Sequence, residues 1–502
     1  MIFRNTAAQT VAYISGYVLS FIIAPVMLAE LGLAAFGIWA VSGAFATYAG
    51  LMDLGIKRSV ERFVALHHAR DDHGGVAQCL GLGLLVVTGV AVPASGAAVV
   101  LAAPLAGGLD EAIAVDDLRA VLLASVGIFI LNAYRFVLDA TAIGMQRMVP
   151  PAVSTIVYGA VSFVLSLWAL LASGDLLTYA LANVAAAGVG VVASVAALHV
   201  AWPAARVRRP SRTLVGGMLG YGVKSQVSWI AELVNLQADK VIIAVAIDVR
   251  AAGAYEIANR AVIAVRTVSS MSLSALLPAA TIALAREGTH VVRSFYRHYA
   301  LRAMSVALPL LIVASVTAPA LLVAWLGEVP TDATAIFIAL TLANVTNIGT
   351  GVASSIWMGE GNAGILALFA TGSALANVAL TVALTPAFGM WGVIGATIAT
   401  ITGTSVVALW QFHRTHPVPI HDTVRAIGAP VLLSLAAASP ILLWLLVRGV
   451  PSEARIGGAV TAAGFVAVFV AIYWPAATRT GILPAKLALR FPRRLARAGQ
   501  PA

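Results

Sequence analysis

Charged and amide side chains recur within segments of this chain that are otherwise apolar enough to cross a lipid bilayer. In one segment they share a helical face, at spacings of 4, 4, 3 and 4 residues: Lys224, Ser228, Glu232, Asn235 and Asp239. A charge at the bilayer centre costs roughly 2.5–3.5 kcal/mol on insertion scales, so it should face a partner or a hydrated cavity. The pattern therefore predicts a polar lining inside a membrane protein.

Four further apolar segments carry residues of the same kind. In chain order the sets are Asp53, Lys57, Arg58, Glu61 and Arg62; then Asn132, Arg135 and Asp139; then Glu256, Asn259, Arg260 and Arg266; then Asn344 and Asn347. The side chains that bear a charge are the candidates for chemistry, because each needs a reason to be there.

Some of these charges can be explained by structure alone. Glu256 and Arg260 are four residues apart, as are Arg135 and Asp139, and this spacing suits an ion pair within one helix. Asp239 can be read as the mark of an outer helix end. For these residues a structural role and a functional role remain open alternatives.

Lys224 and Arg266 have no acid four residues before or after them, which favours a cationic cavity for both. At 1.5 Å per residue, Lys224 would lie about 15 Å from the cytoplasmic start of its helix, and Arg266 would lie about 21 Å in from the outer face. Asn344 and Asn347 are interpreted as polar contacts between helices.

The amino-acid composition is not that of a water-soluble domain. Of 502 residues, 60% are hydrophobic and 10% are charged, whereas a soluble domain has about 25% charged residues. Apolar runs near 20 residues cross a ~30 Å hydrocarbon core as helices, since lipid offers no partner for free backbone polar groups. We predict an all-α integral membrane protein with about 14 transmembrane helices, at 7–28, 34–53, 76–102, 118–138, 150–172, 177–201, 214–236, 240–268, 298–323, 332–354, 362–385, 389–411, 426–447 and 456–474.

Alternate loops between these segments differ in charge. One set is basic, with Arg206, Arg208 and Arg209 in a single loop, and the other is often acidic, as at Asp116 and Asp117. The positive-inside rule places the basic loops and both termini in the cytoplasm. The net charge of +10 then reflects membrane topology, and no nucleic-acid partner is expected.

The chain carries a faint internal repeat. A shift of 216 residues aligns 33–39 with 249–255 and 69–71 with 285–287. Each half begins and ends inside, so the repeats are parallel and a site is expected at their interface. The predicted division is 1–210 (first lobe, six helices), 211–420 (second lobe, six helices), 421–475 (two extra helices) and 476–502 (basic cytoplasmic tail).

Other chemistries find little support. Cys79 is the one cysteine, so no internal disulfide can form. His413, His416 and His421 share a short loop without nearby cysteines or acid clusters, so no metal is expected. The sequence contains no P-loop and no nucleophile elbow. We expect no catalytic residue and no cofactor, and we expect the basic tail to rest on membrane lipids.

Two short motifs carry a family resemblance. Leu51-Met52-Asp53-Leu54-Gly55-Ile56, followed by Arg62-Phe63-Val64-Ala65, resembles the signature of the polysaccharide transporter family, the Wzx-type oligosaccharide flippases of the MOP superfamily, as does Gly253-Ala254-Tyr255-Glu256-Ile257-Ala258. The resemblance implies a V-shaped, MATE-like pair of six-helix lobes with two added helices. It also implies a cavity lined by the first, second, seventh and eighth helices. The first helix departs from this pattern, since it offers only Gln9, Thr10, Tyr13 and Ser15.

The implied function is to flip an undecaprenyl-pyrophosphate-type oligosaccharide across a bacterial inner membrane by alternating access. The implied partners are a polysaccharide polymerase and glycosyltransferases. An anionic pyrophosphate would favour the cations, with Arg58 and Arg62 at the cytoplasmic mouth. The cationic set is Lys224, Arg260, Arg266, Arg58, Arg62 and Arg135. The acids that could couple a proton or sodium gradient are Glu232, Asp239, Glu256 and Asp139.

Three other functions stay open at this point. A cation-coupled drug exporter of the same superfamily would want an acidic or apolar cavity. A flippase for the peptidoglycan lipid precursor would also favour a cationic one. A membrane-embedded glycosyltransferase or polymerase usually needs a sizeable outer loop, and the longest one here, 103–117, is short.

Overall fold

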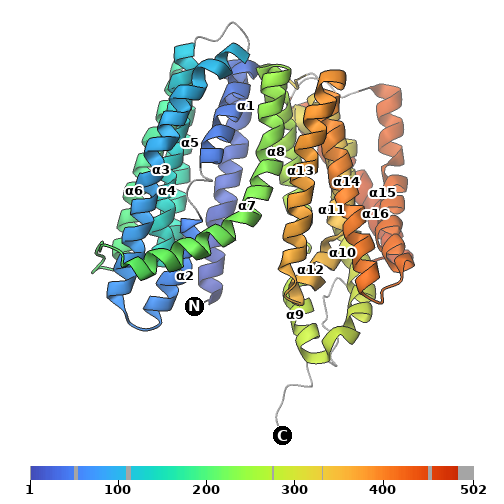
Figure 1. Ribbon diagram of the computed structural model, residues 1–502. Coiled ribbons are helices and arrows are strands. Elements are labelled where there is room, and N and C mark those ends of the chain that lie inside the picture. Colours follow the sequence, from blue (N-terminus) through green and yellow to red (C-terminus); the bar gives the residue numbers. More distant parts are fainter. Residues whose placement is uncertain are drawn as a thin grey trace. The chain divides into compact units, whose positions relative to one another are not determined.

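The computed structural model describes residues 2–49, 55–108, 115–273, 276–330, 332–449 and 455–483; within these ranges the side chains of several stretches, among them 224–236, are not part of the description. In the described chain every regular element is a helix (Figure 1). The elements are α1 (Ile2–Ala49), α2 (Ile56–His68), α3 (His73–Gly108), α4 (Val115–Gly144), α5 (Val149–Ser173), α6 (Leu176–Ala201), α7 (Arg212–Ala246), α8 (Val249–Met271), α9 (Leu276–Glu287), the 3₁₀ turn η2 (Gly288–His290), α10 (Val291–Leu326), α11 (Ala333–Gly349), α12 (Gly351–Gly359), α13 (Ala363–Phe388), α14 (Met390–Thr415), α15 (Ile420–Arg448) and α16 (Arg455–Arg479).

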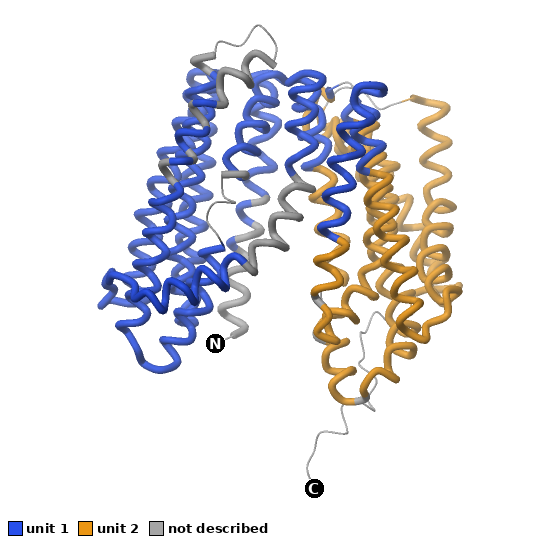
Figure 2. Tube along the Cα trace, viewed as in Figure 1, with its two compact units in different colours: residues 1–260, 330–333, 370–397 blue, residues 261–329, 334–369, 398–502 orange. Residues whose placement is uncertain are grey.

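The chain divides into two compact units, coloured separately in Figure 2. Unit 1 comprises Met1–Arg260, Pro330–Ala333 and Ala370–Thr397. In it α4 packs against α3 and α6, α5 packs against α1 and α6, and α2 lies against α3, α4 and α7. Val60, Cys79, Val137 and Met218 belong to its apolar core, in which the thiol of Cys79 acts as a small buried side chain.

Unit 2 comprises Ala261–Val329, Thr334–Phe369 and Ile398–Ala502. Its α10 packs against α9, α12, α15 and α16. Large aromatic side chains fill the core, and Tyr296, Trp357 and Phe412 are almost fully buried. The Tyr296 hydroxyl lies 2.6 Å from the Thr423 hydroxyl, so its polar end is satisfied inside the core.

Helix ends follow local rules. The Asp175 side chain accepts a hydrogen bond of 2.8 Å from the backbone N–H of Thr178 and caps α6. Within α1, Gly32 has φ +77° and ψ 173°, which interrupts the helix between the first two predicted segments. Glycine adopts this conformation without the steric cost that a Cβ would add.

The all-helical prediction is confirmed, but the exact number of membrane crossings is not. Eleven helical segments of the described chain are long and apolar enough to cross a membrane. One of them, Val18–Thr47, runs through both of the first two predicted segments. The two long helices α7 and α8, which carry the polar residues singled out in the sequence, are not in that set.

The predicted boundary between the seventh and eighth segments is wrong. The sequence suggested a break between 236 and 240, whereas α7 continues to Ala246 and α8 begins at Val249. Asp239 and Lys240 therefore lie inside α7 and are buried, and Asp239 does not mark a helix end. The error arose because a dip in hydropathy was read as a turn.

The depth expected for Lys224 assumed that α7 crosses the membrane as a straight helix, and that depth stays a prediction because the side chain of Lys224 lies outside the described residues. Early α7 lies against α2, where Ser59 donates a hydrogen bond of 2.7 Å to the Met218 carbonyl. Three residues later, the Arg62 guanidinium lies over the Tyr221 ring at 4.5 Å. In Figure 1 the first part of α7 runs at a shallow angle across unit 1, beside α2.

Candidate functional site

A chain of charges links α7 and α8 in unit 1. Lys240 Nζ lies 2.6 Å from Glu256 Oε2, and Arg260 Nε donates to Glu256 Oε1 at 2.8 Å. The Lys240 and Glu256 side chains are 10% and 8% exposed, whereas that of Arg260 is 25% exposed. One acid between two formal cations leaves a surplus positive charge, and Arg260 carries it on the accessible side. The group is hereafter the Glu256 network.

The guanidinium of Arg260 also reaches α1. It lies 5.2 Å from the centre of the Phe36 ring, close enough for a cation–π interaction. Arg260 is thus held on one side by a carboxylate and on another by an aromatic face. Its planar, permanently charged head suits bidentate contact with a phosphate.

Asp239, the residue before Lys240, has different surroundings, made by α8, α13 and α14. Its Oδ2 accepts a hydrogen bond from the Tyr255 hydroxyl at 2.8 Å and another from Thr397 Oγ1 at 2.9 Å. The Thr381 hydroxyl lies 3.5 Å from Oδ1. Asn377 donates to Thr397 Oγ1 at 3.1 Å. These five residues form the Asp239 cluster, a 2% exposed carboxylate in a shell of neutral oxygens.

Two predicted residues of α4 lie within unit 1. Asp139 is 6% exposed and accepts a hydrogen bond from Ser154 at 3.3 Å. Arg135 is 5% exposed, donates to Asn132 at 3.1 Å and lies 4.3 Å from the Tyr158 ring centre. Both side chains are engaged with neighbours on α4 and α5, and this geometry is suited to packing.

Two predicted cations lie on α2. Arg58 and Arg62 are exposed, and Arg62 stacks on Tyr221. Lys57, on the same helix, lies 4.5 Å from the Phe136 ring of α4. The aromatic faces hold the cationic heads in place, while Arg58 and Arg62 remain accessible to an anion.

Three predicted residues remain. Lys224 and Glu232 lie in the part of α7 whose side chains fall outside the described residues. Arg266, in unit 2, is exposed and donates to Asn347 Oδ1 at 3.3 Å. Whether these residues share one chamber with the Glu256 network stays a prediction.

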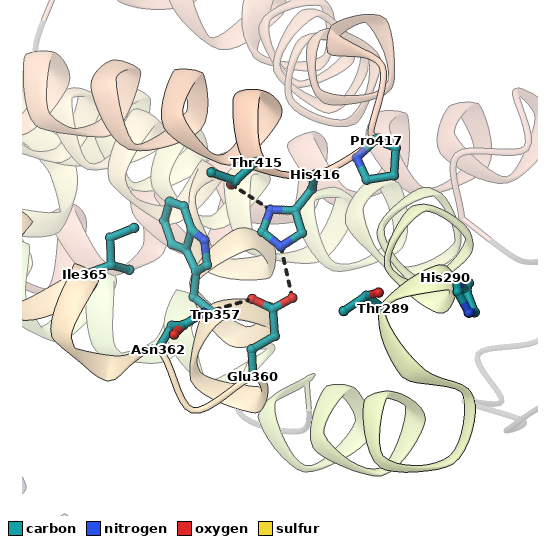
Figure 3. Close-up of a pocket in the computed structure, with 9 residues that line it drawn as sticks. All are labelled: Thr289, His290, Trp357, Glu360, Asn362, Ile365, Thr415, His416 and Pro417. Atoms are coloured by element: carbon teal, nitrogen blue, oxygen red, sulfur yellow. Dashed lines mark hydrogen bonds and ion pairs between the residues drawn. The ribbon is translucent and has the colours of Figure 1, made fainter.

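Unit 2 also contains a cavity of about 540 Å³. His416 Nε2 lies 3.0 Å from Glu360 Oε1 in its wall, beside Thr415 and Asn362 (Figure 3). His413 instead contacts the Val418 carbonyl and the Thr423 hydroxyl. The histidines of this loop are thus used separately, in local contacts. Among the described residues no group of three or more His, Cys, Asp or Glu side chains could hold a metal ion.

The sequence analysis missed the hydroxyl partners of Asp239 and the second cation on Glu256. Thr381 and Thr397 lie 142 and 158 residues from Asp239, so no spacing rule connects them. The sequence signal that could have pointed to such partners is an acid within an apolar stretch that has no basic residue three or four positions away.

This chain resembles a known protein family in sequence and solved structures in fold. The sequence profile of the family described as "Polysaccharide biosynthesis protein" matches residues 2–284. No curated protein sequence matches the chain.

Solved structures share the fold. The lipid II flippase MurJ in an inward closed conformation has a TM-score of 0.71 at 11% identity, covering 94% of this chain and 98% of its own. An inward-facing multidrug resistance MATE family transporter of the MOP superfamily has a TM-score of 0.63 at 14% identity, covering 80% and 94%. A MATE protein in complex with MaL6 has a TM-score of 0.54 at 13% identity, covering 82% and 95%. The expected MATE-like fold is confirmed.

Proposed function

Because the chain belongs to the polysaccharide biosynthesis protein family and is a multi-pass membrane transporter of the MOP superfamily, we propose that it flips a lipid-linked oligosaccharide. The cargo is of the undecaprenyl-pyrophosphate type, and it moves from the cytoplasmic to the outer face of a bacterial inner membrane. Both termini of the protein lie in the cytoplasm in this proposal. A polysaccharide polymerase and glycosyltransferases are the proposed partners.

The surplus positive charge of the Glu256 network is the observation that carries this proposal. Glu256 neutralises one of the two cations it contacts, so Arg260 keeps attraction for an anionic headgroup. Charge-assisted hydrogen bonds to phosphate are strong and directional. Arg58 and Arg62 would receive the headgroup at the mouth, and Arg266, with Lys224, would extend the cationic path. The lipid tail can remain in the bilayer during the crossing.

The four acids named in the sequence analysis differ in fitness for ion coupling. Glu256 is already held by two cations, and Asp139 by a serine among packed helices. Asp239 is held by hydroxyl groups, and carboxylate and hydroxyl oxygens suit a proton or a hard cation such as sodium. Asp239 is therefore the proposed coupling residue. The side chain of Glu232 is outside the described part.

The test is a deletion strain complemented with variants. Without the protein, the lipid-linked glycan should accumulate on the cytoplasmic face. Arg260→Gln and Arg266→Gln should each fail to relieve this accumulation, while Arg209→Gln, which removes an exposed loop charge, should complement fully. Full relief by the Arg260→Gln/Arg266→Gln double variant would refute the assigned role of the cations.

A second candidate is flipping of the peptidoglycan lipid precursor, favoured by the TM-score of 0.71 to MurJ. Both cargos carry an anionic headgroup, so the cations alone do not separate them. Rescue of a strain depleted of its lipid II flippase would select this candidate. A third candidate, drug export, would require dye efflux that survives loss of Arg260.

A further inference from the structure

Two helices of unit 1 cross with their backbones in contact. A Cβ added to Gly253 of α8 would lie 2.6 Å from the Leu33 carbonyl oxygen and 3.2 Å from the Gly37 nitrogen, both on α1. A Cβ added to Gly37 would collide with the Val249 carbonyl oxygen and lie 3.1 Å from the Gly253 nitrogen. Only glycine permits this approach at either position.

The contact is reciprocal in a way that matches the internal repeat. The 216-residue shift pairs Gly37 with Gly253 and Leu33 with Val249. Gly253 faces the Leu33 carbonyl, and Gly37 faces the Val249 carbonyl. The repeat therefore makes the two contacts equivalent, as expected at an isologous contact on a twofold axis. The weakly matched repeat motifs 33–39 and 249–255 therefore meet each other in space.

Both helices are interrupted next to the crossing. In α1 the break is Gly32, with φ +77°. The same shift maps Gly32 onto Asp248, whose side chain accepts a hydrogen bond of 2.6 Å from the Ala251 N–H at the start of α8. The crossing therefore lies about one helical turn after the Gly32 break of α1 and about one turn after the start of α8.

We propose that the Gly37–Gly253 crossing is a closure that opens and re-forms in each transport cycle. It would shut the path from the outer face, where the predicted topology places the Gly32 break of α1 and the start of α8. Two features support this role. Backbone contacts through Cα–H groups are individually weak and can be broken reversibly. Their close approach leaves no room for water. The inference rests on the proposed transport function.

Reversible cross-linking tests the closure directly. In a Cys79→Ala background, Leu33→Cys and Val249→Cys would be joined by a short, reducible bifunctional thiol reagent. Transport should fall at least about tenfold on cross-linking and recover on reduction. Each single-cysteine variant, treated in the same way, controls for modification. Undiminished transport by the cross-linked protein would overturn the proposal and make the crossing a permanent packing contact.

A second experiment does not depend on the cargo. Asn259 lies seven residues before Arg266, on the same helical face, and Asn259→Cys can report access for a membrane-impermeant thiol reagent added to intact cells. Gly37→Val should increase its labelling several-fold, because the closure can no longer form. Gly43→Val is the matched control in α1, since nothing lies within 4 Å of its added Cβ. Equal labelling of the two variants would contradict the closure.

The two experiments separate this inference from the function on which it rests. If the protein moves no lipid-linked glycan but Gly37→Val still opens Asn259→Cys to the outside, the cargo is wrong and the closure stands. If the wild type moves the glycan and cross-linking does not slow it, the closure is wrong and the cargo stands.

Discussion

The Asp239 cluster and the Glu256 network share helices α7 and α8, where their members are adjacent residues, and each surrounds a buried carboxylate with a different kind of partner. Asp239 and Tyr255 meet through a hydroxyl, whereas Lys240 and Glu256 meet as ions. Successive residues of a helix point about 100° apart, so the α7–α8 pair presents one hydroxyl-lined side and one ionic side. We propose the first side for the exchange of a small cation or proton, and the second as a fixed positive charge for an anion.

The largest effect is expected where the ionic side loses its acid. Glu256→Gln leaves Lys240 buried beside a neutral amide, and breaking a buried ion pair in this way typically costs about 3–5 kcal/mol. The measurement is thermal unfolding of the purified protein. The double variant Lys240→Met/Glu256→Leu should recover much of the loss, because it leaves no lysine buried without its acid, while the 25% exposed Arg260 keeps its contact with Phe36. A Glu256→Gln protein as stable as the wild type would show that the network is not a stabilising one.

A smaller effect is expected from one hydroxyl of the other side. Thr397→Val removes a donor to Asp239 while keeping the shape of the side chain, and Tyr255 remains in place. The free energy of unfolding should fall by about 1 kcal/mol, measured in the same assay. Thr267→Val is the matched control, since Thr267 is exposed and bonds within its own helix. If the two substitutions lower the free energy of unfolding by the same amount, the Thr397 hydroxyl does not stabilise Asp239.

Asp239→Asn should separate stability from function. An amide oxygen can still accept from Tyr255, so unfolding should change by less than about 1 kcal/mol. Transport, however, should lose its dependence on a sodium or proton gradient, because the exchangeable charge has gone. The readout is the transport rate with and without each gradient. A variant that keeps the wild-type gradient dependence would remove Asp239 from the coupling role.

The smallest effect concerns an acid outside the membrane segments. The Gly75 N–H and the His67 ring hold the pKa of Asp72 below its usual range. Because the folded-state pKa is depressed, the stabilisation is present at neutral pH and disappears as pH falls through the lowered pKa, below about 4. Asp72→Asn should therefore lower the unfolding midpoint slightly at pH 7 and leave it unchanged in strong acid. An Asp72→Asn protein with the wild-type midpoint at pH 7 would show that the two contacts of Asp72 do not stabilise the fold.

The contrast between the two sides was only half visible in the sequence. The i, i+4 spacing predicted the Glu256–Arg260 pair, and the pair is present. Lys240 could not be assigned to Glu256, because that contact depends on where the α7–α8 hairpin turns. A dip in hydropathy near residue 239 suggested the turn, but the chain turns after Ile243-Ala244-Val245-Ala246, which looks like the interior of an apolar run.

For the internal repeat, the sequence indicated the alignment of the two halves but not the contact between them. The offset of 216 rested on few identities, yet the aligned glycines face each other in the structure. What the sequence could not reveal is that they meet, since an alignment of two halves carries no information on their distance. The hydroxyls around Asp239 were invisible for a similar reason, because threonine in an apolar helix is common and its partner lies far along the chain.

We propose that Arg260 provides the positive charge that draws an anionic lipid-linked headgroup across the membrane. The most direct measurement is the flipping rate of an undecaprenyl-pyrophosphate oligosaccharide in liposomes that contain the purified protein, compared between wild type, Arg260→Lys and Arg260→Gln. We expect transport by the wild type, partial activity with lysine and at least about a tenfold loss with glutamine. Equal rates for all three proteins, or no transport by the wild type, would contradict it.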